Sequence, residues 1–277
     1  MAGSEKPKIG AVEQGAQPLR ARPSLLALGA FRAWLFFTVG VTAIFAFQGF
    51  YEPEIGPISN ILPAVCAFIA FVSAVSNVRR YGLSLKVPFQ AVWLCFAIGT
   101  GVWVLAETSW AVYYFVLNIA VPYPSIADVF YISGYLPMLA ALVLYYRTFR
   151  RSMQRRRLAV AVPVIVGAVS LSLGLVIPLE LSMNYPAIKI ATDMIYPVLD
   201  LTLLSAAILS IAIFIDGTIG RYWGVLAGGI ILYVLGDEFF LYQVANGSYY
   251  NGSVDDLFFL LGYLAFALAF YIHRREF

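Results

Sequence analysis

The feature that most constrains this chain is a series of apolar stretches, each near the length of about 20 residues that crosses a bilayer. Of the 277 residues, 61% are hydrophobic and only 12% are charged, far from the mixture of a soluble domain. The sequence therefore predicts an all-α polytopic membrane helix bundle and argues against a soluble enzyme, a disordered chain or a nucleic-acid-binding protein. We place eight transmembrane helices at residues 25–49, 58–77, 88–117, 125–147, 157–177, 188–215, 222–245 and 254–273.

The residues that could hold a cofactor are few. Cys66 and Cys95 lie inside apolar stretches without CxxC spacing, and the single histidine, His273, lies close to the C-terminal end. A histidine-based metal centre or a bis-histidine haem needs at least two imidazoles at membrane depth. We therefore expect no metal site, no disulfide framework and no cofactor.

The basic residues indicate the orientation of the chain, because lysine and arginine concentrate in cytoplasmic loops. Residues 1–24 are polar and predict a cytoplasmic tail, so that both termini are expected to be cytoplasmic in a multi-pass protein of the cell membrane. Arg32 and Lys189 fall elsewhere. The bases assigned to the cytoplasmic side are Lys6, Lys8, Arg20, Arg22, Arg79, Arg80, Lys86, Arg147, Arg150, Arg151, Arg155, Arg156, Arg157, Arg221, Arg274 and Arg275.

Two segments of the chain resemble each other. The run WVLAETSW followed by PSIADVFYISGYL matches YVLGDEFF followed by GSVDDLFFLLGYL. The matched pairs include Trp93 and Trp223, Gly99 and Gly229, Trp103 and Tyr233, Glu107 and Asp237, Asp128 and Asp256, Gly134 and Gly262, and Tyr135 and Tyr263. Chance apolar similarity does not supply paired acids in one order. The sequence therefore predicts two four-helix repeats, residues 25–147 and 148–277, parallel to each other about an axis along the membrane normal.

Acidic residues gather in the half of the bundle away from these bases, where Lys189 is the one nearby base. Such a field attracts cations or protons, and intramembrane acids are costly enough to suggest function. The acids assigned to the outer half or to mid-membrane are Glu52, Glu54, Glu107, Asp128, Glu180, Asp193, Asp200, Asp237, Glu238, Asp255 and Asp256.

Two of these acids have a structural explanation. Ser125 with Asp128, and Ser253 with Asp256, have the spacing of a capping box that satisfies free N–H groups at a helix start. Lys189 stands four residues before Asp193, so we expect an ion pair between them. Its place at the mouth of a span also argues against a retinal Schiff base.

The remaining acids predict a binding site. Asp200 lies deepest in the bilayer, Glu107 is flanked by tryptophans at helical spacing, and its matched residue is Asp237. The alternative is that these side chains only join helices by hydrogen bonds. The candidate ligand-binding residues are Glu107, Asp193, Asp200, Asp237, Glu238, Trp103, Trp110 and Tyr196, and no catalytic residue is assigned.

The run of Trp103, Glu107 and Trp110, followed by residues 122–135, resembles the multi-span N-terminal sensor region of prokaryotic diguanylate cyclases and histidine kinases. Residues 220–223, 236–237 and 256–263 resemble the second half of that region. The resemblance implies a signal-input module. Because no output domain follows the last span, we expect signalling through a separate membrane or cytoplasmic partner.

A weaker likeness, through residues 235–237 and 260–271, is to lysoplasmalogenase-type membrane hydrolases. It implies acid/base chemistry by Asp193, Asp200 and Asp237. The leading hypothesis is a sensory or accessory protein, rather than an enzyme, that binds a small cation, proton or cationic or lipidic ligand in an outward-facing acidic and aromatic cavity. The sequence leaves open a proton-coupled transporter, a lipid hydrolase and a structural subunit of a membrane complex, and also the oligomeric state.

Overall fold

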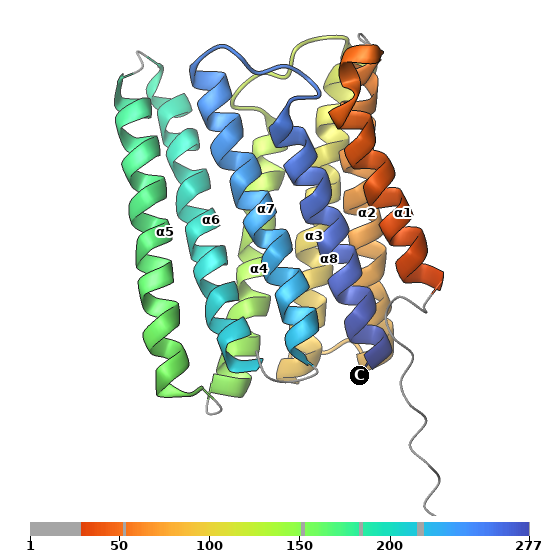
Figure 1. The fold of residues 1–277 in the computed structure, drawn as a ribbon, viewed down its shortest axis with the longest axis vertical. Coiled ribbons are helices and arrows are strands. Elements are labelled where there is room, and N and C mark those ends of the chain that lie inside the picture. Colours follow the sequence, from red (N-terminus) through yellow and green to blue (C-terminus); the bar gives the residue numbers. More distant parts are fainter. Residues whose placement is uncertain (1–28, 52–53, 151–152, 183–184, 215–218, 277) are drawn as a thin grey trace, which may run out of the picture.

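The computed structural model describes residues 29–51, 54–150, 153–182, 185–214 and 219–276, and these residues form a bundle of long helices (Figure 1). The prediction of an all-α fold is confirmed. The predicted tail, residues 1–24, lies outside the described residues. In chain order the elements are α1 (Gly29–Ala46), the short 3₁₀ helix η2 (Gln48–Phe50), α2 (Ile55–Tyr81), α3 (Pro88–Val112), the π-helical turn η3 (Tyr113–Leu117), α4 (Ile126–Phe149), α5 (Arg155–Ser182), α6 (Ala187–Phe214), α7 (Ile219–Ala245) and α8 (Val254–Glu276).

Seven helices in the described part of the chain, α2 to α8, are long and apolar enough to cross a membrane. The chain is therefore a multi-span membrane protein. The remaining helix, α1, is apolar but shorter, with 18 residues. At about 1.5 Å per residue it reaches about 27 Å, slightly less than the hydrocarbon thickness of about 30 Å. The first expected span, residues 25–49, is longer because it includes residues that precede the described part.

The helices divide into an inner and an outer set. α3 packs along α4, and α7 packs along α8. α2 lies against α3 and α8, while α6 lies against α4 and α7. The two remaining helices are peripheral: α5 packs on α6 and α7 at one edge of the bundle, and α1 packs on α8 at the other (Figure 1). The inner set is thus a closed ring of α2, α3, α4, α6, α7 and α8.

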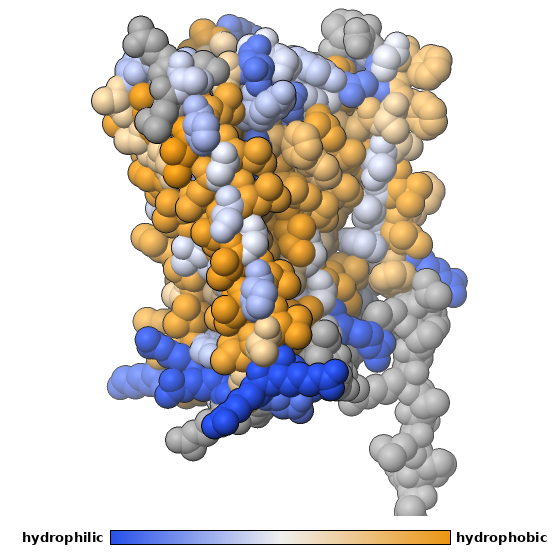
Figure 2. Space-filling view, turned by 60° about the vertical axis from the view of Figure 1, so that its left-hand side comes forward, coloured by the Kyte–Doolittle hydropathy of each residue, from blue (hydrophilic) through white to orange (hydrophobic). Residues whose placement is uncertain are grey.

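The surface has an apolar band with a basic belt at one end (Figure 2). Arg79 and Arg80 end α2, Arg147 lies in the last turn of α4, and Arg274 and Arg275 lie in the last turn of α8. These helix ends are at the same end of the bundle. The belt therefore agrees with the alternation of basic loops along the sequence, and the end opposite to it carries the α3–α4 and α7–α8 connections.

Glycines allow the inner helices to approach closely. A Cβ at Gly99 would lie 2.6 Å from Cγ of Met138 and 3.1 Å from the Gly134 carbonyl oxygen. A Cβ at Gly262 would lie 3.2 Å from the carbonyl oxygen of Gly229, the residue that matches Gly99 in the other half. Small residues at helix contacts are the usual means of close packing in membranes, where lipid is as apolar as the side chains.

We predict that Gly134→Ala destabilises the protein by about 1–3 kcal/mol, because the added Cβ would overlap the Trp103 ring. That ring donates a hydrogen bond of 3.1 Å to the Tyr131 carbonyl oxygen and stacks on Tyr233 at 4.6 Å, so it cannot move freely. The measurement is the melting temperature of the detergent-purified protein. The control is Gly228→Ala, where nothing lies within 4 Å of the added carbon and melting should be unchanged or slightly raised. Equal melting of the two variants would contradict the packing argument.

Candidate functional site

A cavity of about 70 Å³ lies toward the end of the bundle opposite to the basic belt. Tyr123 and Tyr249, from the α3–α4 and α7–α8 connections, lie at its rim, and helices of both halves form its walls. No lysine, arginine or histidine is among the described residues that line it. Its lining is acidic and aromatic: Glu107, Asp128, Asp237 and Asp256 with Trp110, Tyr123, Tyr131, Tyr196, Tyr233, Phe240, Tyr249 and Phe259, beside Ser59, Pro63 and Leu241.

Asp128 caps α4 and also faces the cavity. Its Oδ2 accepts a hydrogen bond of 2.6 Å from the Ser125 backbone N–H, and the capping box predicted for this pair is confirmed. Its Oδ1 accepts a bond of 2.7 Å from the Tyr196 hydroxyl. Asp128 therefore both caps the helix and lines the cavity.

Asp256 begins α8 in a different way from the one predicted. Its Oδ2 accepts a hydrogen bond of 2.6 Å from the backbone N–H of Gly252, which has a φ of +100° that favours glycine. The Ser253 hydroxyl donates instead to Asp255. The physical reason is the residue just before the acid: the first half has Ala127 there, whereas the second half has Asp255, which accepts the hydrogen bond from the serine hydroxyl.

The deepest acids meet at one tyrosine. The Tyr135 hydroxyl lies 2.5 Å from Oδ1 of Asp200 and 2.8 Å from Oδ2 of Asp237. All three residues are buried, Asp200 completely. A hydroxyl has one hydrogen and can donate it to only one of the two oxygens. The second contact is a hydrogen bond only if that carboxyl is protonated and donates to the tyrosine oxygen.

Glu107, in the first half of the chain, is bonded to a tyrosine of the second half. Its Oε1 accepts a hydrogen bond of 2.8 Å from the Tyr263 hydroxyl, which lies 3.3 Å from the Tyr233 hydroxyl. Tyr263 matches Tyr135 in the sequence, and Glu107 matches Asp237. Each of these tyrosines thus bonds an acid of the other half of the chain.

The aromatic side chains behind the cavity also make contacts between the two halves of the chain. Trp103 and Tyr233, which match in the sequence, stack with their ring centroids 4.6 Å apart and their planes 5° apart. Tyr135 packs edge-on against both rings. The contact joins α3 to α7 at the level of the acids.

Four of the candidate ligand-binding residues line the cavity: Glu107, Trp110, Tyr196 and Asp237. Two more lie behind it. Trp103 stacks on Tyr233 of the cavity wall, and Asp200 is linked to Asp237 of the wall by Tyr135. The structure therefore brings together six of the eight candidates.

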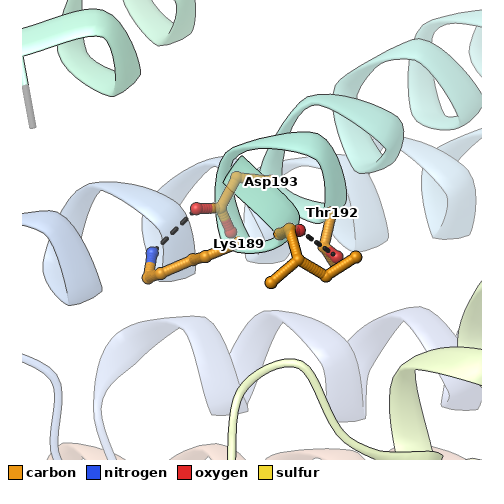
Figure 3. A network of polar contacts seen from close by, with 4 residues as sticks. Lys189, Thr192 and Asp193 are labelled. Carbon is orange, nitrogen blue, oxygen red and sulfur yellow. Dashed lines mark hydrogen bonds and ion pairs between the residues drawn. The ribbon is translucent and has the colours of Figure 1, made fainter. Parts of the chain in front are cut away.

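Asp193 is not among these six residues and forms an ion pair with a lysine. Its Oδ2 forms an ion pair of 2.7 Å with Nζ of Lys189, as expected from the spacing (Figure 3). Nζ of Lys189 also lies 3.7 Å from the ring centroid of Tyr185 and 5.2 Å from that of Tyr123. Tyr123 lines the cavity, so Lys189 and Asp193 form a charged pair beside the rim, and Asp193 does not itself face the cavity.

Glu238 lies in a separate groove. It follows Asp237 on α7 and therefore points to another face of that helix. There the Ser172 hydroxyl of α5 donates a short hydrogen bond to it, in an apolar groove of about 550 Å³ lined by α5, α6 and α7. The sequence grouped Glu238 with Asp237 by adjacency, and the helical turn separates them.

Several tyrosines in or behind the cavity were not predicted to belong to the site. Tyr135 and Tyr263, behind the cavity, belong to the matched Gly-Tyr-Leu runs, which were interpreted as evidence of a repeat and of a resemblance to sensor regions. Tyr131 and Tyr249, which line the cavity, are not matched in this way. Their positions depend on which helix faces meet, whereas Tyr135 and Tyr263 could have been found from the sequence match.

The two rim tyrosines lie outside the membrane-spanning helices. Burial raises the pKa of Tyr123, and the nearby carboxyl groups of Asp193 and Asp128 raise it further. Burial, with Asp256 and Asp255 nearby, also raises the pKa of Tyr249. Both therefore present neutral hydroxyl groups, and the negative charge available at the cavity comes from its carboxyl groups.

No family model, curated protein or solved structure matches this chain. Its chemistry therefore has to be argued from the site itself. Among the described residues, no group of three or more histidine, cysteine, aspartate or glutamate side chains is placed to hold a metal ion. Carboxyl groups between aromatic faces can attract an organic cation both by charge and through the ring faces.

We predict that Tyr135→Phe lowers the free energy of unfolding by about 1–3 kcal/mol, because Asp200 and Asp237 lose their common hydrogen-bond partner at a buried position. The change keeps the ring and its packing. Thermal unfolding in detergent measures the effect. Tyr242→Phe is the control, since this side chain is 59% exposed on the apolar surface of α7. A Tyr135 variant as stable as the control would show that the hydroxyl contributes no stability.

Proposed function

We propose that this chain is a sensory or accessory membrane protein that binds a small organic cation, an ammonium compound, in the cavity between its two halves. The observation that carries the proposal is the lining of this cavity. Four carboxyl groups and eight aromatic side chains face one space, and no base is among its described lining residues. An ammonium group in such a space gains from both the negative charge and the ring faces, most strongly where water is excluded.

The size of the cavity limits the ligand. A single water molecule requires about 10–15 Å³ of such space, so about 70 Å³ accommodates a compact ligand or a few waters. Methylammonium is of this class, whereas a whole lipid or a peptide is not. The wider apolar groove at Glu238 is separated from the cavity by α7, with Leu241 lining both.

The proposal includes an architecture of two parallel four-helix repeats, residues 25–147 and 148–277, with α1 as an eighth span and both termini cytoplasmic. The contacts between the halves support it: Tyr135 contacts Asp237, Tyr263 bonds Glu107, and Trp103 stacks on Tyr233. The basic belt supports the orientation. The outer helices depart from this symmetry, because α1 packs on α8 whereas α5 packs on α6 and α7.

The sensory role rests on where the cavity lies. Glu107 comes from α3 and Asp237 from α7, so a ligand that pairs with both would favour one arrangement of the two halves over others. Ligand binding shifts such an equilibrium by its difference in affinity for the two arrangements. The resemblance of the α3–α4 and α7–α8 motifs to prokaryotic sensor regions supports the same role. We infer that a separate membrane or cytoplasmic partner receives the signal.

The test is thermal unfolding of the detergent-purified protein with methylammonium, tetramethylammonium, sodium or potassium as chlorides. We expect the alkylammonium ions to raise the melting temperature in a saturable way, because ligand at 100 times its Kd stabilises the folded state by about 2.7 kcal/mol. Equal concentrations of sodium and potassium should raise it less, since they gain less from the ring faces.

Two variants locate the effect. Glu107→Gln should abolish the shift or weaken it at least tenfold in ligand concentration, since it removes a charge that faces the cavity. Glu238→Gln is the matched control, because its carboxyl group lies in the other groove and the shift should persist. A wild-type protein that responds equally to all four salts would exclude a specific ammonium site in the cavity.

A further inference from the structure

Two carboxyl groups of the site differ in their access to the cavity. Asp237 of α7 lines it, whereas Asp200 of α6 is completely buried behind Tyr135. The Tyr135 hydroxyl contacts both, at 2.8 Å and 2.5 Å. The carboxyl pair is thus open to the cavity on one side and closed by protein on the other.

The geometry around the Tyr135 hydroxyl favours a proton shared by Asp200 and Asp237. The tyrosine supplies one hydrogen for two carboxyl oxygens, so one of the carboxyl groups must supply another for both contacts to be hydrogen bonds. The second oxygen of Asp200 has no hydrogen-bond partner among the described residues, which disfavours a full charge there.

The groups around the pair add no positive charge. They are carboxyl groups from α3, α4, α7 and α8 and tyrosine hydroxyls. The titratable groups that share the cavity or contact its lining are Glu107 of α3, Asp128 and Tyr131 of α4, Tyr196 of α6, Tyr233 of α7, Asp256 and Tyr263 of α8, and Tyr123 and Tyr249 of the connections. Glu238 of α7 lies close to the pair in sequence but faces the other groove. Lys189, the base beside the rim, is paired with Asp193.

We propose that a cation enters this cavity in exchange for the proton that Asp200 and Asp237 share. This inference rests on the proposed function. When an ammonium ion approaches Asp237, the O–H bond of the protonated carboxyl group breaks and the proton passes to water in the cavity. The bonding electrons stay on the carboxylate, whose new negative charge balances the cation.

The exchange is favoured because it leaves the net charge of the buried site unchanged. Adding a charge to a space within the membrane costs several kcal/mol unless it is balanced. Tyr135 can turn its hydroxyl hydrogen toward whichever carboxylate is ionised, so the charge is hydrogen-bonded before and after exchange. Asp200 is in this account a positioning residue, since it does not touch the cation.

The experiment measures binding and proton release together. Methylammonium is added to the full-length protein in weakly buffered detergent solution, with calorimetry for affinity and a pH indicator for released protons. An alkylammonium ion keeps its own proton from about pH 5 to about pH 8, so the released protons come from the protein. We expect up to one proton per bound cation, and an affinity that rises by up to about tenfold per pH unit where the pair titrates.

Asp200→Asn separates exchange from binding. The amide can still donate to the Tyr135 oxygen, while Asp237 loses the partner with which it shared a proton. We expect methylammonium still to bind, with proton release and the pH dependence of affinity reduced at least twofold. Thr202→Val is the control on the same helix, since the Thr202 side chain is exposed, donates its hydrogen bond to the Val198 carbonyl oxygen and does not line the cavity, and it should keep both.

The outcomes distinguish the two proposals. Absence of methylammonium binding to the wild-type protein at any pH would overturn the proposed function together with the exchange. Binding without proton release, at an affinity independent of pH, would overturn the exchange alone. Unchanged release in a folded Asp200→Asn variant would overturn the assignment to this pair. The wild-type proton count tests the exchange even if that variant does not fold.

Discussion

The interaction on which the arrangement of the inner helices depends is the bonding of tyrosine hydroxyls to acids across the centre of the bundle. A carboxyl group within the membrane has no bulk water to solvate it, so its hydrogen bonds must come from protein. The Tyr135 hydroxyl contacts both Asp200 and Asp237, and the Tyr263 hydroxyl donates a hydrogen bond to Glu107. Because each tyrosine bonds an acid of the other half, satisfying these acids also fixes how the halves meet.

Close packing makes these bonds possible. Gly134 leaves room for the Trp103 ring against α4, and Gly229 leaves room for Phe266 against α7. The Trp103 ring can then stack on Tyr233, which bridges α3 and α7 through their side chains at the depth of the acids. Small residues and buried acids thus act together: the first set the distance between helices, and the second set their rotation and register.

Much of the fold could be predicted from the sequence, because membrane spans are local apolar stretches and basic residues mark one end of each. α2 to α8 begin and end within a few residues of the expected limits, and the described part of the first span, α1, ends at Ala46, three residues before the expected limit. The candidate site was only partly predictable. Helical spacing identified Glu107 and Trp110, but the separation of Asp237 from Glu238 depends on which face of α7 meets α8 and which meets α5, and no local pattern gives it.

The relation between stability and the proposed function at this site depends on how many hydrogens the tyrosine and the two carboxyl groups share. A hydrogen bond that only joins helices needs one donor and one acceptor, such as a tyrosine and a single carboxylate. Two carboxyl groups on the Tyr135 hydroxyl can both be hydrogen-bonded only with an extra proton at a buried position, which is an arrangement sensitive to both pH and any nearby charge. Since Asp237 also lines the cavity, a cation there would act directly on this proton. This is the reason for which we propose that the second carboxyl group serves ligand binding as well as helix packing.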